Sequence, residues 1–370
     1  MNAASSMLLI GIGGAGAAMA RGINRAFGED VRFMIADTDA STGVPGGPFT
    51  LLGGDRLSGR GTGGDVVAAR LAAEDSVQVL DESLESVRLA VIVTALGGGT
   101  GGGATLEAVK HLNERGIPSI VFATLPFAFE GEDRQRNARG VMTMIEESAS
   151  ATFFIPLDKL IGDSDNMAEA MRRAVDTLAS GITLFWRLVG KPGYIRLDAE
   201  RIRHIVTHAG RGRFAAVTVQ GPNRAKDAVD ALARAQILTS GSGPVRAILC
   251  GILAGEDLRL SEVGSIASGV RTTFGEHCAF ELATVNDEAT FAGRISVVLM
   301  LFEASGRDEA IAAKKGGAGT TAGGGRRKPR AILGQGPSGR GRFNNSEPTI
   351  WNGEDLDTPT YLRRGINLDF

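Results

Sequence analysis

The feature that most constrains this chain is a run of six glycines around one threonine, G-G-G-T-G-G-G, at residues 97–103. It follows an apolar stretch at 89–94, typical of a buried strand, and precedes a helical pattern at 105–115. Without Cβ atoms, successive backbone N–H groups can turn toward one point, and such a nest at a helix N-terminus binds phosphate oxygens. A flexible turn is the alternative, but turns rarely interrupt a strand–helix junction so densely. Because no Gly-Lys-Ser/Thr follows, the run is not a P-loop.

Two further glycine-rich stretches occupy similar positions. G-I-G-G-A-G at residues 11–16 lies between a strand pattern at 7–12 and a helical pattern that runs through Ala26. Alone, this loop would suggest a dinucleotide-dependent oxidoreductase. Two such loops after separate strands instead fit one phosphate chain held from two sides. A third stretch, G-R-G-T-G-G at 59–64, is suited to a terminal phosphate.

The order of apolar and helical segments predicts an α/β fold with a parallel, Rossmann-like nucleotide-binding domain at residues 7–166. Further strands are expected at 31–36 and 118–124, and a helix near 65–84. A long central helix is expected at 167–189, with an apolar face formed by Met167, Met171, Ala174, Leu178, Ile182 and Phe185. A second, smaller α/β domain is expected at 190–304. Its strands are predicted at 214–220, 245–254, 279–285 and 295–302, and its helices at 199–208, 225–237 and 261–272.

The C-terminal region differs in composition. Residues 305–350 are rich in glycine and poor in apolar residues, which predicts a disordered linker. Residues 351–370 carry a motif-like segment from Asp355 to Arg364, which predicts a peptide that binds a partner. A basic run at 326–330 is more simply a solvated linker than a contact with lipid or nucleic acid.

Composition narrows the class of protein. The 370 residues carry a formal net charge of -2, so no nucleic-acid partner is expected. No stretch is long and apolar enough to span a bilayer. Cys250 and Cys278 are expected to be reduced, buried thiols of a cytoplasmic protein. His204 and His208 are four residues apart but lack a third ligand, so no metal site is predicted.

These stretches, in this order, resemble the FtsZ family of the bacterial tubulin superfamily. The run at 97–103 is similar to the family's G-G-G-T-G-T-G, with Gly102 in place of the second threonine. D-T-D-A at 37–40 is similar to its N-T-D-A loop, and residues 124–134 to its P-F-x-F-E-G-x-x-R segment. Residues 255–263 and 286–298 resemble its second domain. The resemblance covers about residues 8–302 and the C-terminal segment, and it implies a tubulin/FtsZ-like fold.

The resemblance implies a GTP- or GDP-binding cytoskeletal protein that polymerises head-to-tail into filaments in bacterial cell division. Magnesium is an optional companion of the phosphates. Glu130 would accept from the ribose hydroxyls, and Arg134 would pack near the sugar or base; without the resemblance they would be a surface pair. The residues expected to bind the nucleotide are Gly13, Gly14, Ala15, Gly16, Ala17, Ala18, Thr38, Gly61, Thr62, Gly63, Gly97, Gly98, Gly99, Thr100, Gly101, Gly102, Gly103, Glu130, Arg134, Asp158 and Asp176.

The chain departs from the family's pattern where the base would be read. Leu157 replaces the family's Asn in I-P-N-D, leaving Asp158. Met171 stands at the place of an aromatic residue that commonly stacks on the base, whereas Asp176 keeps the acid that reads guanine. The implied guanine selectivity is therefore less strictly determined than in the family.

A larger departure lies in the loop that, in the family, enters the neighbouring subunit's nucleotide pocket. The family's N-x-D-F-A-D reads R-L-D-A-E-R at residues 196–201. Asp198 matches the first acid, and Glu200 lies one residue from the second; these two are the expected catalytic residues. Arg196 and Arg201 replace the Asn and the second acid. Restoring that acid by Arg201→Asp is expected to raise turnover.

Three functions therefore remain open. The first is an assembling GTPase whose hydrolysis at the subunit interface is weakened. The second is a non-hydrolysing structural filament or a regulatory paralogue of FtsZ. The third, a Rossmann-type oxidoreductase, is disfavoured by the glycine–threonine nest. By resemblance, the partner of the segment from Asp355 to Arg364 would be a membrane-tethering division protein at the division site.

Overall fold

The computed structural model describes residues 6–27, 32–160, 166–191, 193–197, 199–206, 210–239, 243–303, 350–351 and 354–355. Its strands are β1 (Met7–Ile12), β2 (Phe33–Asp37), β3 (Phe49–Leu51), β4 (Leu89–Ala95), β5 (Ser119–Leu125), β6 (Ala151–Pro156), β7 (Gly210–Gln220), β8 (Val245–Ala254), β9 (Ala279–Asn286) and β10 (Arg294–Glu303). Its α-helices are α1 (Gly13–Phe27), α2 (Gly54–Leu57), α3 (Val66–Glu74), α4 (Val77–Ser83), α5 (Gly99–Glu114), α6 (Glu132–Ser148), α7 (Met167–Gly190), α8 (Ala199–Val206), α9 (Arg224–Arg234), α10 (Gln236–Thr239), α11 (Leu260–Phe274) and α12 (Glu288–Phe291). Three 3-10 helices are η2 (Ala40–Thr42), η3 (Ala128–Glu130) and η4 (Leu157–Lys159).

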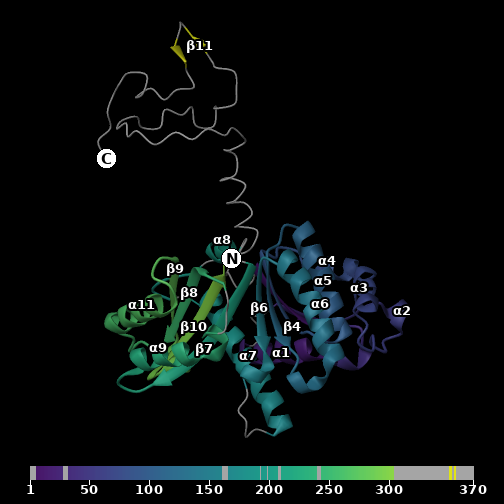
Figure 1. The fold of residues 1–370 in the computed structure, drawn as a ribbon, viewed down its shortest axis with the longest axis horizontal. Coiled ribbons are helices and arrows are strands. Elements are labelled where there is room, and N and C mark those ends of the chain that lie inside the picture. Colours follow the sequence, from purple (N-terminus) through teal and green to yellow (C-terminus); the bar gives the residue numbers. More distant parts are fainter. Residues whose placement is uncertain are drawn as a thin grey trace, which may run out of the picture. The chain divides into compact units, whose positions relative to one another are not determined.

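In the described part of the chain these strands form one ten-stranded sheet, in the order β3-β2-β1-β4-β5-β6-β7-β10-β8-β9 (Figure 1). The strands from β3 to β7 run parallel to their neighbours, whereas β10 is antiparallel to β7 and β8. From β1 the chain passes to β2 on one side, and β4 then pairs with β1 on the other. This reversal of strand order is a topological switch point, where ligands bind beyond the carboxyl ends of the strands.

Helices cover both faces of the sheet. Alternate residues of β1 belong to two different cores, as the two-residue period of a strand requires. α1 and α7 pack on one face, and α3, α5 and α6 on the other. α9 and α11 cover one face of the strands from β7 to β9. Each strand is therefore fixed by apolar contacts on both sides, which holds its carboxyl end in place.

The central helix α7 confirms the predicted apolar face where its side chains are described. Leu178, Ile182 and Phe185 are buried, with Trp186 beside them. They share one core with residues of β5, β8, β9 and β10, so α7 joins the two halves of the sheet. The side chains of Met167, Met171 and Ala174 lie outside the described residues.

Two local predictions were wrong, and two elements were missed. The helix expected near 65–84 is two helices, because α3 ends at Glu74 and α4 begins at Val77. α5 begins at Gly99, so most of the predicted glycine loop is the first turn of a helix. α6 and β6 were not predicted at all, since α6 buries only Ala138, Val141 and Ile145 and carries Gly140.

The remaining predictions concern other features. Cys250 is buried, which raises the pKa of its thiol to about 12, whereas Cys278 is partly exposed.

Residues Met1–Gly316 and Gly317–Phe370 form separate structural units. In the second unit, β11 (Ile350–Trp351) pairs with β12 (Glu354–Asp355). The predicted linker at 305–350 and the peptide from Asp355 to Arg364 otherwise lie outside the described residues. None of the described helices combines the length and apolar character needed to cross a bilayer.

Candidate phosphate-binding site

The first glycine loop is a direct passage from β1 into α1. β1 ends at Ile12 and α1 begins at Gly13, whose φ is +75°. A Cβ built on Gly16 would lie 2.4 Å from the carbonyl oxygen of Val93, so α1 approaches β4 more closely than any side chain permits. The first N–H groups of α1 have no partner within the helix and face the carboxyl edge of the sheet.

The second glycine run places the N-terminus of α5 beside that of α1. β4 ends at Ala95, and Gly97 with φ +104° turns the chain into α5. A Cβ on Gly101 would lie 2.0 Å from the Ala95 carbonyl oxygen, and one on Gly99 would lie 2.1 Å from Thr62 Oγ1. Gly98 differs, because a Cβ there would meet open space. Two helix N-termini therefore meet at the switch point, an arrangement that favours anions.

The third loop closes the site from the side of α3. Gly61, Gly63 and Gly64 all have positive φ, and the Gly61 N–H donates to the Thr38 carbonyl. Among the described residues, the N–H groups of Thr62, Gly63 and Gly64 have no backbone acceptor. This loop therefore offers three donors beside the two helix N-termini, as a terminal phosphate requires.

A cleft of about 340 Å³ lies between the three loops. Of the residues predicted to bind nucleotide, those that line it are Gly13, Gly14, Ala15, Gly61, Thr62, Gly63, Gly98, Gly99, Thr100, Gly101 and Arg134. Ile12, Asp37, Asp39, Thr42, Gly64, Ala95 and Leu96 complete the lining. The cleft thus joins segments that are more than eighty residues apart in the sequence, and its volume is that of a small-molecule site.

Polar side chains tie the loops together beneath the cleft. The hydroxyl oxygens of Thr38 and Thr100 lie 2.7 Å apart, which joins the end of β2 to the first turn of α5. Asp37 accepts from the Thr38 N–H and from the Thr42 hydroxyl. Hydrogen bonds from Ser41 hold the pKa of Asp39 below its ordinary value, so Asp39 is a carboxylate at neutral pH.

Asn137 on α6 was missed by the sequence analysis. Its side-chain amide donates to the carbonyl oxygen of Gly64 at 3.1 Å and to that of Gly97 at 3.4 Å. It therefore joins the third glycine loop, at residues 59–64, to the turn before α5. The sequence held one available signal, an amide three residues after Arg134 in the segment that resembles the family, but its partners are 40 and 73 residues away.

Glu130 and Arg134 lie together at the rim of the cleft. Glu130 accepts from Arg134 at 2.7 Å and from the Phe127 N–H at 2.9 Å. Arg134 lines the cleft, whereas Glu130 does not. Glu130 thus orients Arg134, and the expected contact of Glu130 with a ribose stays a prediction.

The residues expected near the base lie outside this cleft. Asp158 accepts from the Ala128 N–H at 3.2 Å. Asp176 is exposed on α7 and lines a different cavity of about 460 Å³ between α7 and β7. One turn further along each helix, a Cβ on Gly22 of α1 would lie 3.5 Å from Ala179 Cβ, so α1 and α7 are neighbours here. Ala18 is exposed on the same side of α1, and a base between Ala18 and Asp176 stays a prediction.

Other predicted residues support the cleft from behind. Ala17 is fully buried, and a Cβ on Gly103 would lie 2.1 Å from the Val66 carbonyl oxygen. Gly102 faces the side chain of Val141. The remaining predicted residues that do not line the cleft are Gly16, Ala18, Thr38 and Gly97. Their expected role in binding stays a prediction.

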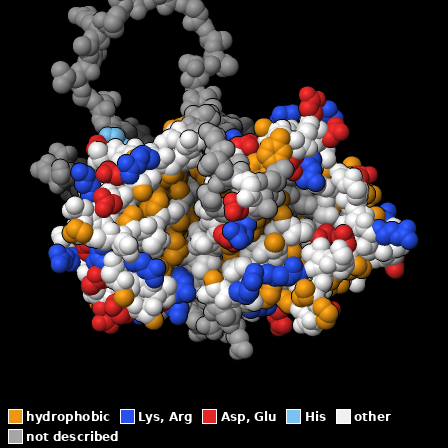
Figure 2. Space-filling view, turned by 90° about the horizontal axis from the view of Figure 1, so that it is seen from below, with side chains coloured by type: hydrophobic (Ala, Val, Ile, Leu, Met, Phe, Trp, Pro, Cys, Tyr) orange, Lys and Arg blue, Asp and Glu red, His pale blue; other side chains and the backbone are white. Residues whose placement is uncertain are grey.

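The face at which the first strands end carries no broad field of one charge. In Figure 2, acidic and basic side chains are interspersed over the described atoms of this face, with apolar side chains between them. This pattern agrees with the net charge of -2 and offers no extended track for a polyanion. The site is thus a local one, made by backbone donors.

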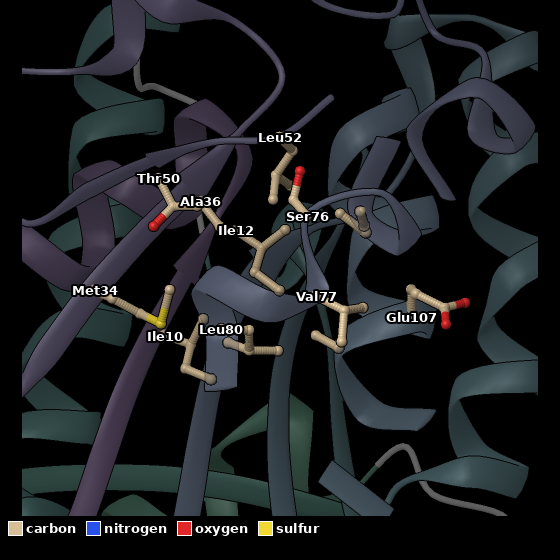
Figure 3. A pocket seen from close by; sticks show the side chains of 13 residues that line it. Ile10, Ile12, Met34, Ala36, Thr50, Leu52, Ser76, Val77, Leu80 and Glu107 are labelled. Carbon is tan, nitrogen blue, oxygen red and sulfur yellow. The ribbon is translucent and has the colours of Figure 1, made fainter. Parts of the chain in front are cut away.

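A third cavity, between β1, β2 and α4, is much smaller (Figure 3). Its volume of about 30 Å³ holds little more than one or two water molecules. Its walls are mostly apolar, and the buried Glu107 beside it is paired with Arg70 and Lys110. It is an internal packing defect and does not compete with the cleft as a nucleotide site.

The expected catalytic loop lies at the far end of α7 from the cleft. Arg187, near the end of α7, donates to the carbonyl of Ala26 in the last turn of α1, at 3.4 Å. Because α1 begins at the cleft and rises about 1.5 Å per residue, its last turn is roughly 20 Å away. Glu200 on α8 pairs at 3.5 Å with Arg88, which precedes β4. Asp198 lies outside the described residues.

The side chain of Arg201 is engaged within its own subunit. Its guanidinium forms an ion pair with Glu281 on β9. Glu200 is therefore not brought to the cleft of its own molecule, and no group of three metal-ligating side chains occurs among the described residues. If a magnesium ion accompanies the nucleotide, phosphate oxygens and water molecules would be among its ligands.

Comparison with known proteins agrees with this geometry. A family model described as the Tubulin/FtsZ family, GTPase domain, matches residues 6–165. The chain is 30% identical over 285 residues to the cell division protein FtsZ of Pseudomonas putida, covering 75% of this chain and 72% of that protein. The FtsZ of Pseudomonas aeruginosa matches to the same extent, 30% over 285 residues, 75% and 72%.

Solved structures share the fold. An empty FtsZ dimer of M. jannaschii superposes with a TM-score of 0.74 at 22% identity, covering 82% of this chain and 89% of that one. A GTPγS-bound protofilament of CetZ2 from Haloferax volcanii gives a TM-score of 0.69 at 19% identity, covering 84% and 99%. Sequence and structure thus agree, and the chain belongs to the tubulin/FtsZ family.

Proposed function

We propose that this protein is a GTP-binding cytoskeletal protein that polymerises head-to-tail into filaments. The observation that carries the proposal is the meeting of two glycine-built helix N-termini and a third loop of free N–H groups around one cleft. Such a site binds a phosphate chain through backbone donors and needs no P-loop lysine. Membership of the tubulin/FtsZ family supports guanine as the base.

Head-to-tail assembly is supported by what lies at the two ends. The cleft is at one end of α1 and α7, and the loop after α7 is at the other. That loop exposes Tyr194 at 80% and Ile195 at 40% of their surface, and Phe129 beside the cleft is 59% exposed. Apolar side chains at both ends fit a heterologous contact, which repeats without closing and so yields a filament. A relative is described as a GTPγS-bound protofilament.

GTP hydrolysis would occur at the contact between subunits. In this proposal Asp198 and Glu200 approach the nucleotide of the next subunit, because the described Glu200 lies at the far end of α7 from the cleft of its own molecule. Asp198 would orient the attacking water, with Glu200 as the second acid. Glu200 is tied to Arg88 and Arg203, which supports slower hydrolysis than in a loop with two free acids.

A role in bacterial cell division follows from the relatives, which are described as cell division proteins. The segment from Asp355 to Arg364 would then bind a membrane-tethering division protein, bringing filaments from the cytoplasm to the division site. A chain truncated after Glu347 should polymerise normally but lose its localisation in cells. If truncation stops assembly of the purified protein, the segment belongs to the filament instead.

The first experiment is electron microscopy of the purified protein with GTP, with GDP and without nucleotide, alongside a phosphate-release assay. Filaments with GTP and phosphate release that depends on them support the proposal. Tight nucleotide binding without filaments under any condition contradicts it.

A second candidate function is a filament that binds GTP without hydrolysing it. The ion pair of Arg201 with Glu281 favours it, because the family's second acid is absent and its replacement is engaged within the subunit. Filaments that form with GTP, persist, and release no phosphate would establish this alternative.

A further inference from the structure

The phosphate cleft is rich in backbone donors but poor in positive charge. Among the described residues that line it, Arg134 is the single basic side chain, and it is paired with Glu130 at 2.7 Å. Asp37 and Asp39 line the same cleft. A nucleoside triphosphate brings several negative charges, and the reacting phosphoryl group is normally stabilised by cations. The described lining therefore supplies one basic side chain, and further positive charge must come from a bound cation or from another subunit.

Two arginines flank Asp198 at the opposite end of the molecule, and the structure distinguishes them. Arg201 is paired with Glu281 of β9, whose side chain is 25% exposed. Arg196 is exposed, and no hydrogen bond or ion pair joins it to another described residue. Of the two, Arg196 alone is therefore presented to a neighbouring molecule.

The loop that carries Arg196 is held against β9 on both sides of Asp198. Ile195 donates to Thr284 Oγ1 at 3.0 Å and accepts from the Thr284 N–H at 2.8 Å. Gly193 is so close that a Cβ there would lie 1.6 Å from the Thr284 carbonyl oxygen. Beyond Asp198, the Arg201 pair provides the second attachment. A short loop fixed at two points presents its exposed side chains in a defined direction.

Burial of the adjacent apolar residues completes this attachment. Leu197 is 5% exposed and Ile202 is fully buried, both in the core that α7 shares with β9. Arg196 therefore precedes a residue anchored in the core, while Tyr194 and Ile195 form the exposed surface beside it. A guanidinium in this place stays charged at all accessible pH values and matches phosphate oxygens with two donors.

We propose that Arg196 adds a positive charge at the terminal phosphates of the next subunit's nucleotide, and that Arg201 is a positioning residue which holds this loop through Glu281. The proposal rests on the head-to-tail assembly proposed above. It reverses the expectation from the sequence that Arg201→Asp raises turnover. A carboxylate at that place would face Glu281, repel it and release the loop from β9.

The test compares Arg196→Ala and Arg196→Lys with Arg234→Ala, which removes an exposed arginine from α9. Two quantities are measured: phosphate release per assembled subunit, and the lowest protein concentration that assembles with a slowly hydrolysed GTP analogue. Arg196→Ala should lower release on the order of 10²-fold and raise the assembly concentration, with Arg196→Lys between it and the wild type. Arg234→Ala should match the wild type.

Arg60 is the alternative source of the cation within the same subunit, since it is exposed on the loop that precedes Gly61. A larger loss of phosphate release in Arg60→Ala than in Arg196→Ala overturns the proposal.

A mixing experiment tests whether Arg196 acts on the cleft of another subunit. Gly98→Val subunits, with an intact loop, are mixed with Arg196→Ala subunits, which keep an intact cleft. Recovered phosphate release in the mixture supports a contact between subunits, and no recovery despite co-assembly overturns it.

The positioning role has its own test by charge exchange. Arg201→Glu should lower release per assembled subunit without changing nucleotide affinity or the melting temperature of the monomer. Arg201→Glu combined with Glu281→Arg should restore a large part of the release. Failure of the double variant to recover overturns the role of Arg201.

The two proposals fail in distinguishable ways. Wild-type filaments without phosphate release end the hydrolytic part of the proposed function, while the assembly concentration with the analogue still decides whether Arg196 makes the contact. Equal assembly concentrations and equal release in Arg196→Ala and wild type overturn the inference about Arg196 alone. A wild type that never assembles overturns both.

Discussion

The hydroxyl oxygens of Thr38 and Thr100 lie 2.7 Å apart, at a point where β2 ends and α5 begins. Thr38 is fully buried, whereas Thr100 lines the cleft. One hydroxyl therefore fixes the other, and the first turn of α5 is held in register with the loop that follows β2. The contact joins residues 62 positions apart. It fixes Thr100, the threonine of the glycine run at 97–103, in the lining of the cleft.

Thr100→Val should weaken nucleotide binding about tenfold, because it removes a hydroxyl donor and leaves the buried Thr38 hydroxyl without this partner. Thr100→Ser keeps the hydroxyl and should bind nearly as the wild type does. Titration with a fluorescent GTP analogue measures both affinities. Equal affinities for Thr100→Val and wild type would show that the hydroxyl pair plays no part in binding.

Valine at Gly98 and valine at Gly101 should each abolish nucleotide binding, but for different physical reasons. At Gly98 a side chain meets open space in the cleft, so Gly98→Val should fold normally and lose nucleotide binding. At Gly101 a Cβ would lie 2.0 Å from the Ala95 carbonyl oxygen, so Gly101→Val should lose stability as well. Melting temperatures and nucleotide titrations separate the two effects. Undiminished affinity in a folded Gly98→Val would contradict the phosphate site.

The sequence predicted a phosphate site at these glycines, and the structure gives most of them a packing role as well. At Gly98 a Cβ would meet open space in the cleft, so the phosphate-binding role of this glycine stays a prediction. At Gly99, Gly101 and Gly103 the structure adds another reason, close packing against Thr62, Ala95 and Val66. Glycine has a low helix propensity, so a run of glycines predicts a loop. Packing against distant residues makes this run the first turn of α5. The start of α5 could therefore not be predicted from helix propensity.

Contacts between residues far apart in the chain could not be predicted from the sequence. Arg201 and Glu281 are 80 positions apart, and neither follows a local pattern that indicates the other. The same holds for Asn137 and its two carbonyl partners. By contrast, β1, β4, β5 and α7 were predicted because each carries a continuous apolar run or a regular apolar face, which local residues alone determine.

Tyr194→Glu should raise the protein concentration needed for assembly while leaving GTP affinity unchanged. The side chain is 80% exposed at the end opposite the cleft, so a charge there disturbs only a contact with another molecule. Sedimentation with GTP measures assembly. A matched control is Val79→Glu, since Val79 on α4 is also exposed, at 45%. If both variants assemble like the wild type, Tyr194 lies outside the filament contact.

The second half of the sheet should lose stability in acid through Glu262. A hydrogen bond from Arg224, which is buried, lowers the pKa of Glu262 below its ordinary value. Because the folded pKa is the lower one, this contribution is present above about pH 4.5 and is lost as the pH falls through the folded pKa. Urea unfolding from pH 6 to pH 3 should therefore show a weaker pH dependence for Glu262→Gln.

Arg224→Met tests the same network from the other side. It leaves Asp257 and Glu262 without their cation and should cost about 3 kcal/mol of unfolding free energy at neutral pH. The loss should shrink in acid, as the carboxylates become protonated. A variant as stable as the wild type at pH 7 would show that the ion pairs are offset by solvation.

If hydrolysis needs two subunits, phosphate release per subunit must depend on protein concentration, which a dilution series measures. Release per subunit should rise with concentration through the assembly threshold. Asp198→Ala should reduce the plateau on the order of 10²-fold while GTP affinity stays unchanged. Release per subunit that stays constant on dilution far below the threshold would contradict the shared site.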